Sequence, residues 1–197
     1  AFLTLSHLTR RPPILGIGAG ERENTEPYGL DFTTPVARLE EALQIIRMCF
    51  SSRGPFDYQG RHFRLQLALL DLPPGRGGVP EIWIAAHRPR MLRLTGIYGD
   101  GWYPSFPMTP DEYAGKLSTI RAAAVGAGRD PASITPGFQI ITVLGRTRHE
   151  ARLLLETRAI RFLALMVAGY VWRSKGAAHP FGESFGGIVD LVPPSFT

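Results

Sequence analysis

The sequence has a single cysteine, Cys49, among its 197 residues, so no disulfide can form within the chain. One thiol on the apolar side of a helical pattern is typical of a packed residue in a protein kept in a reducing compartment. We therefore expect a cytoplasmic protein in which Cys49 is not a nucleophile. Lysine is nearly as scarce, because Lys116 and Lys175 are the only two, and the rest of the 22 basic residues are arginine.

Long hydrophobic runs are also missing. The most apolar segment, Leu163–Val171, is closed by Arg161 and Arg173 and is far shorter than the roughly 18 apolar residues of a membrane span. The first residues form a helix-like pattern without the basic stretch that opens a secretory leader. The sequence thus predicts no membrane span and no signal peptide.

The formal charge of +5 comes from basic residues that are scattered along the chain. Nucleic-acid binding favours a basic cluster interleaved with aromatic residues, and no such cluster is present. We expect no nucleic-acid partner. A mild positive charge does suit a protein that binds an anionic cofactor.

Several catalytic signatures are absent. Gly16, Gly18 and Gly20 follow a predicted strand, but a dinucleotide fingerprint needs its third glycine where this chain has Glu21. The phosphate-loop lysine and the G-x-S-x-G elbow are missing as well. No metal-ligand spacing occurs among the histidines, which are His7, His62, His87, His149 and His179. We expect no metal site.

What is present is an alternation of short β-rich runs with longer segments of helical period. The strands are expected at Ile14–Gly18, Ile82–Ala86, Gly101–Tyr103, Phe138–Leu144 and Gly187–Val192. The helices are expected at Thr34–Phe50, Pro89–Gly96, Thr109–Gly126 and, in one or two pieces, Arg148–Val171. A hairpin-like excursion covers Phe56–Leu65 and Pro73–Pro80. Such alternation predicts a parallel sheet with crossover helices, as an open doubly wound sheet or part of a barrel.

A series of short motifs, in order over about 120 residues, resembles the bacterial-luciferase-like superfamily of oxidoreductases. The motifs are Leu15–Glu21 with Asn24, Tyr28–Gly29, Ala37–Glu41, Phe56–Phe63, Pro80–Ala86 and Gly99–Trp102. The resemblance implies a (β/α)8 barrel. Within the superfamily, the chain resembles the branch that uses the deazaflavin coenzyme F(420), and its tail from Trp172 to Gly187 resembles the ketoreductases of that branch.

The same resemblance implies that the chain is incomplete at both ends. In the family, three barrel strands precede the segment that aligns with Phe2–Gly20, and they carry the catalytic histidine and tryptophan. We therefore expect an α/β protein, a partial (β/α)8 TIM barrel that lacks the first three strands. Residues 1–197 would form one domain, a fragment that is inactive alone and belongs to a homo-oligomer in its full-length form.

Two candidate site residues follow the first predicted strand, at the barrel end where reacting groups lie. Glu21 matches a glutamate that donates a proton in a sugar-phosphate dehydrogenase of the family, and burial beside a flavin raises a carboxyl pKa toward that role. The alternative is a loop residue near a helix N-terminus. Asn24 matches a position that hydrogen-bonds the deazaflavin; the alternative is an Asx turn.

The turn formed by Ala85, Ala86, His87 and Arg88 lies between a strand end and a helix start. Backbone amides at such a position hold phosphate well, and an arginine adds charge. The family binds the cofactor phosphate here, commonly with glycines, so His87 and Arg88 depart from its pattern. A solvated basic turn is the alternative. Trp83 and Trp102 are expected in the barrel or interface core and not as cofactor contacts.

The combined prediction is an F(420)-dependent oxidoreductase. Hydride would pass from the reduced deazaflavin to a carbonyl, in a small-molecule or lipid-like ketone, with Glu21 supplying the proton. Because deazaflavins react poorly with oxygen, a ketoreductase or dehydrogenase is favoured over a monooxygenase. The alternatives are an FMN-dependent luciferase-like monooxygenase and a catalytically inactive fragment of such an enzyme.

Overall fold

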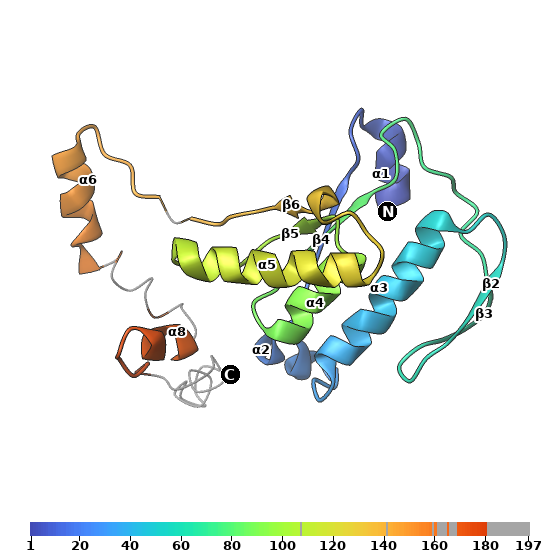
Figure 1. Cartoon of the computed structure of the whole chain (residues 1–197), viewed down its shortest axis with the longest axis horizontal. Helices are drawn as coiled ribbons and strands as arrows, with labels where there is room; N and C mark the ends of the chain where they lie inside the picture. The colour runs from blue at the N-terminus through green and yellow to red at the C-terminus, as the bar shows by residue number, and fades with distance from the viewer. Residues whose placement is uncertain (107, 141, 159, 161–164, 166–168, 181–197) are drawn as a thin grey trace. The chain divides into compact units, whose positions relative to one another are not determined.

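The computed structural model describes the chain except residues 107, 141, 159, 161–164, 166–168 and 181–197 (Figure 1). The chain divides into two compact units. The first unit comprises Ala1–Gly20 with Thr33–Gln139, and the second comprises Glu21–Phe32 with Ile140–Thr197.

The first unit is built on a four-stranded parallel sheet with the order β1-β4-β5-β6. The strands are β1 (Ile14–Ile17), β4 (Glu81–Ile84), β5 (Gly101–Trp102) and β6 (Thr135–Pro136). In the register, Leu15 lies opposite Ile82, and Trp83 lies opposite Gly101. Because side chains alternate along a strand, this register places Leu15, Ile82 and Trp102 on one face.

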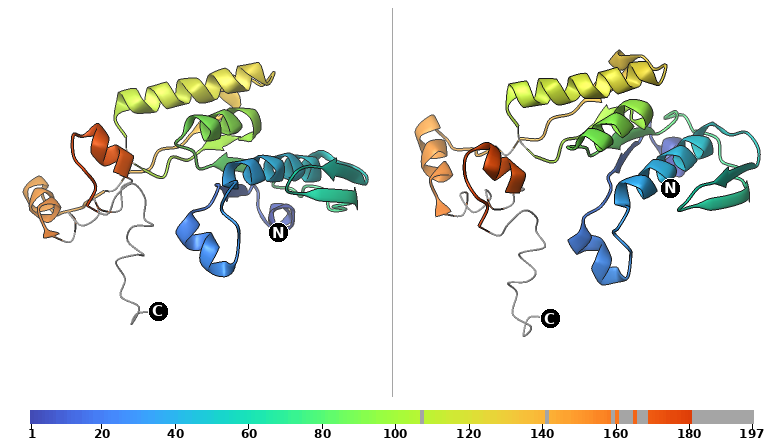
Figure 2. Two further views of the ribbon diagram at one scale, coloured as in Figure 1. Left: turned by 90° about the horizontal axis from the view of Figure 1, so that it is seen from below. Right: turned by 60° about the horizontal axis from the view of Figure 1, so that its bottom comes forward.

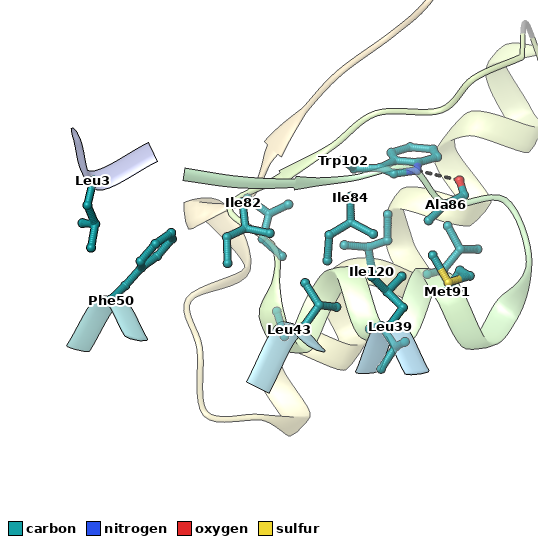
Figure 3. Packing of buried hydrophobic residues seen from close by; sticks show 14 residues of the cluster. Leu3, Leu39, Leu43, Phe50, Ile82, Ile84, Ala86, Met91, Trp102 and Ile120 are labelled. Carbon is teal, nitrogen blue, oxygen red and sulfur yellow. Dashed lines mark hydrogen bonds between the residues drawn. The ribbon is translucent and has the colours of Figure 1, made fainter. Parts of the chain in front are cut away.

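Three helices cover that face (Figure 1). They are α3 (Pro35–Ser51), α4 (Pro89–Tyr98) and α5 (Pro110–Gly126). One hydrophobic cluster joins them to the sheet, with Leu43, Ile82, Ile84, Trp102 and Ile120 fully buried (Figure 3). Burying a leucine or isoleucine side chain contributes about 1.5–3 kcal/mol, so this cluster is a main source of the unit's stability.

Local signals explain where these helices begin. Proline is the first residue of each, a position where its missing N–H costs no hydrogen bond. At α5 the predicted capping box is present, because Thr109 accepts from the Glu112 backbone N–H and the Glu112 carboxylate accepts from Thr109. Thr34 precedes α3 as predicted but makes no side-chain capping bond.

An ionic cluster centred on Asp100 lies at the starts of the strands. Its carboxylate lies 2.8 Å from the Arg47 guanidinium and 3.3 Å from that of Arg129. It also accepts a 2.9 Å hydrogen bond from the backbone N–H of Ile82. Asp100 therefore ties α3, β4 and the segment after α5 together at the amino-terminal edge of the sheet.

A hairpin, β2 (Phe56–Gln59) with β3 (Arg64–Ala68), forms a separate antiparallel sheet beside α3 in all views (Figures 1 and 2). The Glu41 carboxylate on α3 accepts hydrogen bonds from the backbone N–H groups of Arg61, His62 and Phe63, at 2.9, 2.9 and 3.0 Å. Desolvation raises the Glu41 pKa, but these three bonds outweigh it and the net pKa is lowered. The hairpin predicted at Phe56–Leu65 is thus confirmed and anchored at its turn, whereas Pro73–Pro80, predicted as part of the same excursion, contains no strand.

Shorter elements complete the described residues. In the first unit they are α1 (Phe2–Leu8) and the 3-10 helix η2 (Pro131–Ser133). In the second unit they are α2 (Arg22–Thr25), the 3-10 helix η1 (Glu26–Tyr28), α6 (Arg148–Leu155) and α8 (Gly169–Ser174). Among the described residues, no helix has the length and hydropathy that a membrane span requires.

The α/β architecture and the first three predicted strands are confirmed, but the fourth is wrong. No strand is assigned to the described residues between Phe138 and Leu144; the fourth strand is instead β6, just ahead of them. Phe138 and Leu144 are largely exposed, so their alternation reflects no pairing. Within the helix predicted from Arg148 to Val171, the described residues include α6 and the first residues of α8. The strand predicted at Gly187–Val192 lies outside the described residues.

Candidate functional site

The turn at residues 85–88 leaves the carboxyl end of β4 and leads into α4. Two hydrogen bonds from neighbouring strands hold its backbone. The Ala85 N–H donates to the Ile17 carbonyl over 2.9 Å, and the Trp102 indole N–H donates to the Ala86 carbonyl over 2.9 Å (Figure 3). Trp102 is fully buried, as expected of a core residue. The turn is therefore fixed from both sides of β4.

His87 is the most constrained side chain of this turn. Its Nε2 accepts a 2.9 Å hydrogen bond from the backbone N–H of Ser105, in the segment after β5. Its ring lies against Phe106, with 4.9 Å between the ring centroids. The Nδ1 atom is buried and has no hydrogen-bond partner in the described residues. His87 thus joins two strand-end segments and leaves one ring nitrogen unsatisfied.

Positive charge surrounds this histidine. Burial first, and then the charges of Lys116 and Arg88, lower the His87 pKa from 6.5 to about 4. Lys116 comes from α5, and its own pKa is lowered by burial and by Arg88, while Glu112 acts in the opposite direction. The ring is consequently neutral near pH 7, and two cations lie within electrostatic range of it.

The start of α4 has the features of a phosphate site. Arg88 is the N-cap residue and no side-chain capping bond forms there, so the first free N–H groups of the helix lack that partner. A helix N-terminus with uncapped N–H groups favours an anion, and Arg88 and Lys116 add charge. The unsatisfied Nδ1 of His87 is a further polar atom. This donor set fits a cofactor phosphate.

The sheet face opposite the helices carries a hollow of about 450 Å³. Its lining residues are mainly apolar or small: Ile14, Gly16, Ile17, Gly18, Trp83, Ala85 and Tyr103. A Cβ atom on Gly16 would meet nothing within 4 Å, so the space above β1 is open within the first unit. Trp83, which was expected in the barrel or interface core, lies on this face and donates its indole N–H to the Glu81 carboxylate.

Glu21 and Asn24 belong to the second unit, whereas the 85–88 turn belongs to the first. Glu21 is the N-cap residue of α2, and its carboxylate accepts a 2.8 Å hydrogen bond from the Asn24 side-chain amide. The Glu21 carbonyl accepts from the Asn24 backbone N–H over 3.1 Å. Both side chains are exposed. The structure therefore brings these two predicted residues together as a hydrogen-bonded pair.

A family model described as luciferase-like monooxygenase matches residues 1–184. The chain belongs to the luciferase-like monooxygenase family. The match covers both units and includes all six candidate site residues.

Two mycobacterial relatives in this family are similar over most of the chain. The phthiodiolone/phenolphthiodiolone dimycocerosates ketoreductase of Mycobacterium tuberculosis is 48% identical over 194 residues, which are 98% of this chain and 51% of that protein. The F(420)-dependent hydroxymycolic acid dehydrogenase of the same organism is 34% identical over 157 residues, 77% of this chain and 42% of that protein. The chain thus spans about half the length of the curated relatives it matches.

A solved structure of the coenzyme F(420) dependent tetrahydromethanopterin reductase from Methanopyrus kandleri shares the fold. The TM-score is 0.69 at 19% identity, over 91% of this chain and 58% of that one. This likeness shows that the luciferase-like chain shares the fold of part of that structure.

Sequence reasoning missed Lys116 and Ser105. Ser105 donates a hydrogen bond to His87, and the charge of Lys116 acts on the His87 ring. Both residues follow the turn in the chain, and Lys116 lies on α5, which packs on α4. The one sequence feature that could have drawn attention to Lys116 is composition, because it is one of two lysines in an arginine-rich chain. The described residues contain no group of three or more His, Cys, Asp or Glu side chains that could hold a metal.

Proposed function

We propose that this chain is part of a coenzyme F(420)-dependent oxidoreductase that reduces a ketone on a lipid-like or other small molecule. The observation that carries the proposal is the donor set at the 85–88 turn, which fits a cofactor phosphate. The 48% identity to a ketoreductase supports the substrate class, and the 34% identity to an F(420)-dependent dehydrogenase supports the cofactor.

In the proposed enzyme, the start of α4, with Arg88, holds the phosphate. A reduced deazaflavin held there would supply hydride for reduction of the carbonyl. Glu21 gives a proton to the carbonyl oxygen, so that the ketone becomes an alcohol. Asn24 contacts the cofactor ring and, through its 2.8 Å hydrogen bond, orients the Glu21 carboxyl group.

We further propose that the four parallel strands belong to a (β/α)8 barrel, in which the open face with Gly16 and Trp83 faces the interior. The fold shared with a larger reductase and the apolar hollow on that face support this assignment. Three preceding strands, the four described strands and the strand predicted at Gly187–Val192 would together make up the eight strands of the barrel. Without the three preceding strands, residues 1–197 are expected to self-associate through the β1 edge and to show no turnover.

The test joins the preceding half of the M. tuberculosis ketoreductase to residues 1–197 and titrates the chimera with F(420) and with FMN. F(420) should bind more tightly, and Arg88→Ala should weaken it by about tenfold or more, because a charge-assisted contact contributes roughly 1.5–3 kcal/mol. Glu21→Gln should keep cofactor affinity and lower turnover by about 10²–10⁴-fold. Arg93→Gln, on an exposed position of α4, is the matched control.

Two alternatives give different outcomes in this experiment. Tighter FMN binding, with oxygen consumption, indicates an FMN-dependent monooxygenase. A chimera that folds and binds neither cofactor indicates that the chain derives from an inactive remnant.

A further inference from the structure

The hydrogen bond from Ser105 to His87 determines where the imidazole proton lies. A backbone N–H can only donate, so the Nε2 atom that accepts it carries no proton. A neutral ring with a bare Nε2 has its proton on Nδ1. His87 is therefore a neutral Nδ1–H tautomer, whose Nδ1–H is a donor.

That donor has no partner among the described residues and is closed off from solvent. Buried polar atoms are nearly always hydrogen-bonded, so an unsatisfied one points to an acceptor outside the described chain. The acceptor's charge follows from the neighbours. Arg88 and Lys116 both act on the ring with positive charge. The Glu112 carboxylate acts on Lys116 with the opposite charge and also accepts from the backbone N–H and the hydroxyl of Thr109, so it offsets part of this positive charge.

We propose that His87 donates its Nδ1–H to an anionic oxygen of the bound cofactor, that Lys116 is a second, charge-supplying ligand of the same group, and that His87 stays uncharged throughout. The inference rests on the proposed function, since it takes the anion to be a cofactor phosphate. The residues 85–88 adjust on binding, because Nδ1 has no opening to solvent in the structure.

This arrangement differs from the usual expectation for a histidine near phosphate, which is an imidazolium that binds through its charge. An imidazolium site gains affinity as the pH falls through about 6.5. A neutral donor gains no affinity as the pH falls, because the ring cannot accept a proton on Nε2 without losing the hydrogen bond from Ser105. The charged groups acting on the ring are Arg88, from its own turn, and Lys116, from α5.

The first measurement is the ¹⁵N spectrum of histidine-labelled protein between pH 5.5 and 8. His87 should show one protonated Nδ1 and one unprotonated Nε2 across the range. An Nε2–H tautomer, or an imidazolium at pH 6, overturns the inference. Inorganic phosphate, F(420) and FMN are then added in turn, and each ligand that binds should shift the Nδ1 resonance.

The second measurement is the affinity for F(420) and FMN, by fluorescence, in matched variants. His87→Phe keeps the ring packing but removes the donor, and we expect a loss of about tenfold. His87→Asn can still accept from Ser105 and donate, so it should bind within about threefold of the wild type. Lys116→Gln should lose about tenfold and become less sensitive to salt. Arg121→Gln, at an exposed position of α5, is the control.

The outcomes separate the two proposals. If phosphate shifts the His87 nitrogens but neither cofactor binds, the proposed function fails and the role of His87 stands. If cofactors bind and His87→Phe binds equally well, or if none of the three ligands shifts the ring nitrogens, the role of His87 is refuted. Affinity that rises several-fold from pH 7.5 to 5.5 in the wild type, but not in His87→Asn, also refutes it.

Discussion

The indole N–H of Trp102 donates a 2.9 Å hydrogen bond to the carbonyl oxygen of Ala86, so that a fully buried side chain of β5 fixes the turn after β4. The carbonyl direction sets the direction of the following peptide, which leads into His87. Trp102 is thus both a core residue and the support of the candidate phosphate turn.

Trp102→Phe should therefore destabilise the protein and loosen the turn. The variant leaves a buried carbonyl without its donor and a gap beside Tyr113, whose ring stacks on Trp102 at 4.8 Å. We expect the free energy of unfolding to fall by about 2–3 kcal/mol, measured by urea denaturation. Tyr103→Phe removes an exposed hydroxyl and should change it by less than about 0.5 kcal/mol. Equal losses in both variants would contradict this role of Trp102.

A second prediction concerns the ionic cluster on Asp100. Asp100→Asn removes the charge that neutralises the partly buried Arg47 and Arg129, and we expect a loss of about 2 kcal/mol in unfolding free energy. The control is Glu40→Gln, which breaks a more exposed pair with Arg90 and should cost about 0.5 kcal/mol or less. Similar values for both variants would show that the cluster on Asp100 is no stronger than a surface ion pair.

The free energy of unfolding should decrease as the pH is lowered, in two separable pH windows. Because the folded-state pKa of His87, about 4, lies below the value of 6.5, the unfolded chain takes up a proton first as the pH decreases. The contribution of His87 to the free energy of unfolding is complete above pH 6.5 and is lost progressively as the pH falls toward 4. Glu41 also has a lowered pKa, so its contribution is present above pH 4.5 and is lost below it.

Chemical denaturation at several pH values checks this prediction. In His87→Phe the free energy of unfolding should decrease less steeply between pH 6.5 and 4, because up to about one proton fewer is taken up on unfolding. Its decrease below pH 4.5 should remain. Glu41→Gln should show the opposite pattern. A His87→Phe profile that matches the wild type across the upper window would mean that the folded-state pKa is close to its ordinary value.

Local patterns predicted the elements of the first unit well, because each carries its own signal. The proline that begins α4 and the capping box of α5 are features of a few adjacent residues. The strand predicted at Phe138–Leu144 failed for a tertiary reason. Pairing with β5 ends at Gly137, whose N–H donates to the Trp102 carbonyl over 2.8 Å, and alternation without a partner strand does not make a strand.

The candidate site shows the same division. The 85–88 turn could be predicted because a strand end and a helix start are adjacent in sequence. The contribution of Lys116 could not, because it depends on how α5 packs against α4. The proton position on His87 depends on the hydrogen bond that Ser105, 18 residues away, donates to Nε2, and no sequence pattern encodes this bond. The roles assigned to Glu21, Asn24 and Arg88 remain predictions.

A further prediction tests the anchor of the hairpin. Glu41→Gln replaces a carboxylate that accepts three backbone N–H groups by an amide that has one acceptor oxygen. Hydrogen exchange at Arg61, His62 and Phe63 should accelerate by about tenfold, with little change in the core strands. Unchanged exchange at these three amides would show that the turn holds its shape without Glu41.

The contact between Glu41 and the hairpin turn also bears on how this surface can vary. The Glu41 carboxylate binds the backbone N–H groups of the turn. This contact does not depend on which side chains stand at Arg61, His62 and Phe63. The exposed Arg61 is therefore free to drift in evolution or to accept a grafted residue while the hairpin keeps its place, whereas the His62 ring also lies 3.4 Å from the Thr34 hydroxyl. Gly60 is not free to drift, because a Cβ atom there would overlap the Glu41 carboxylate and the Tyr58 ring.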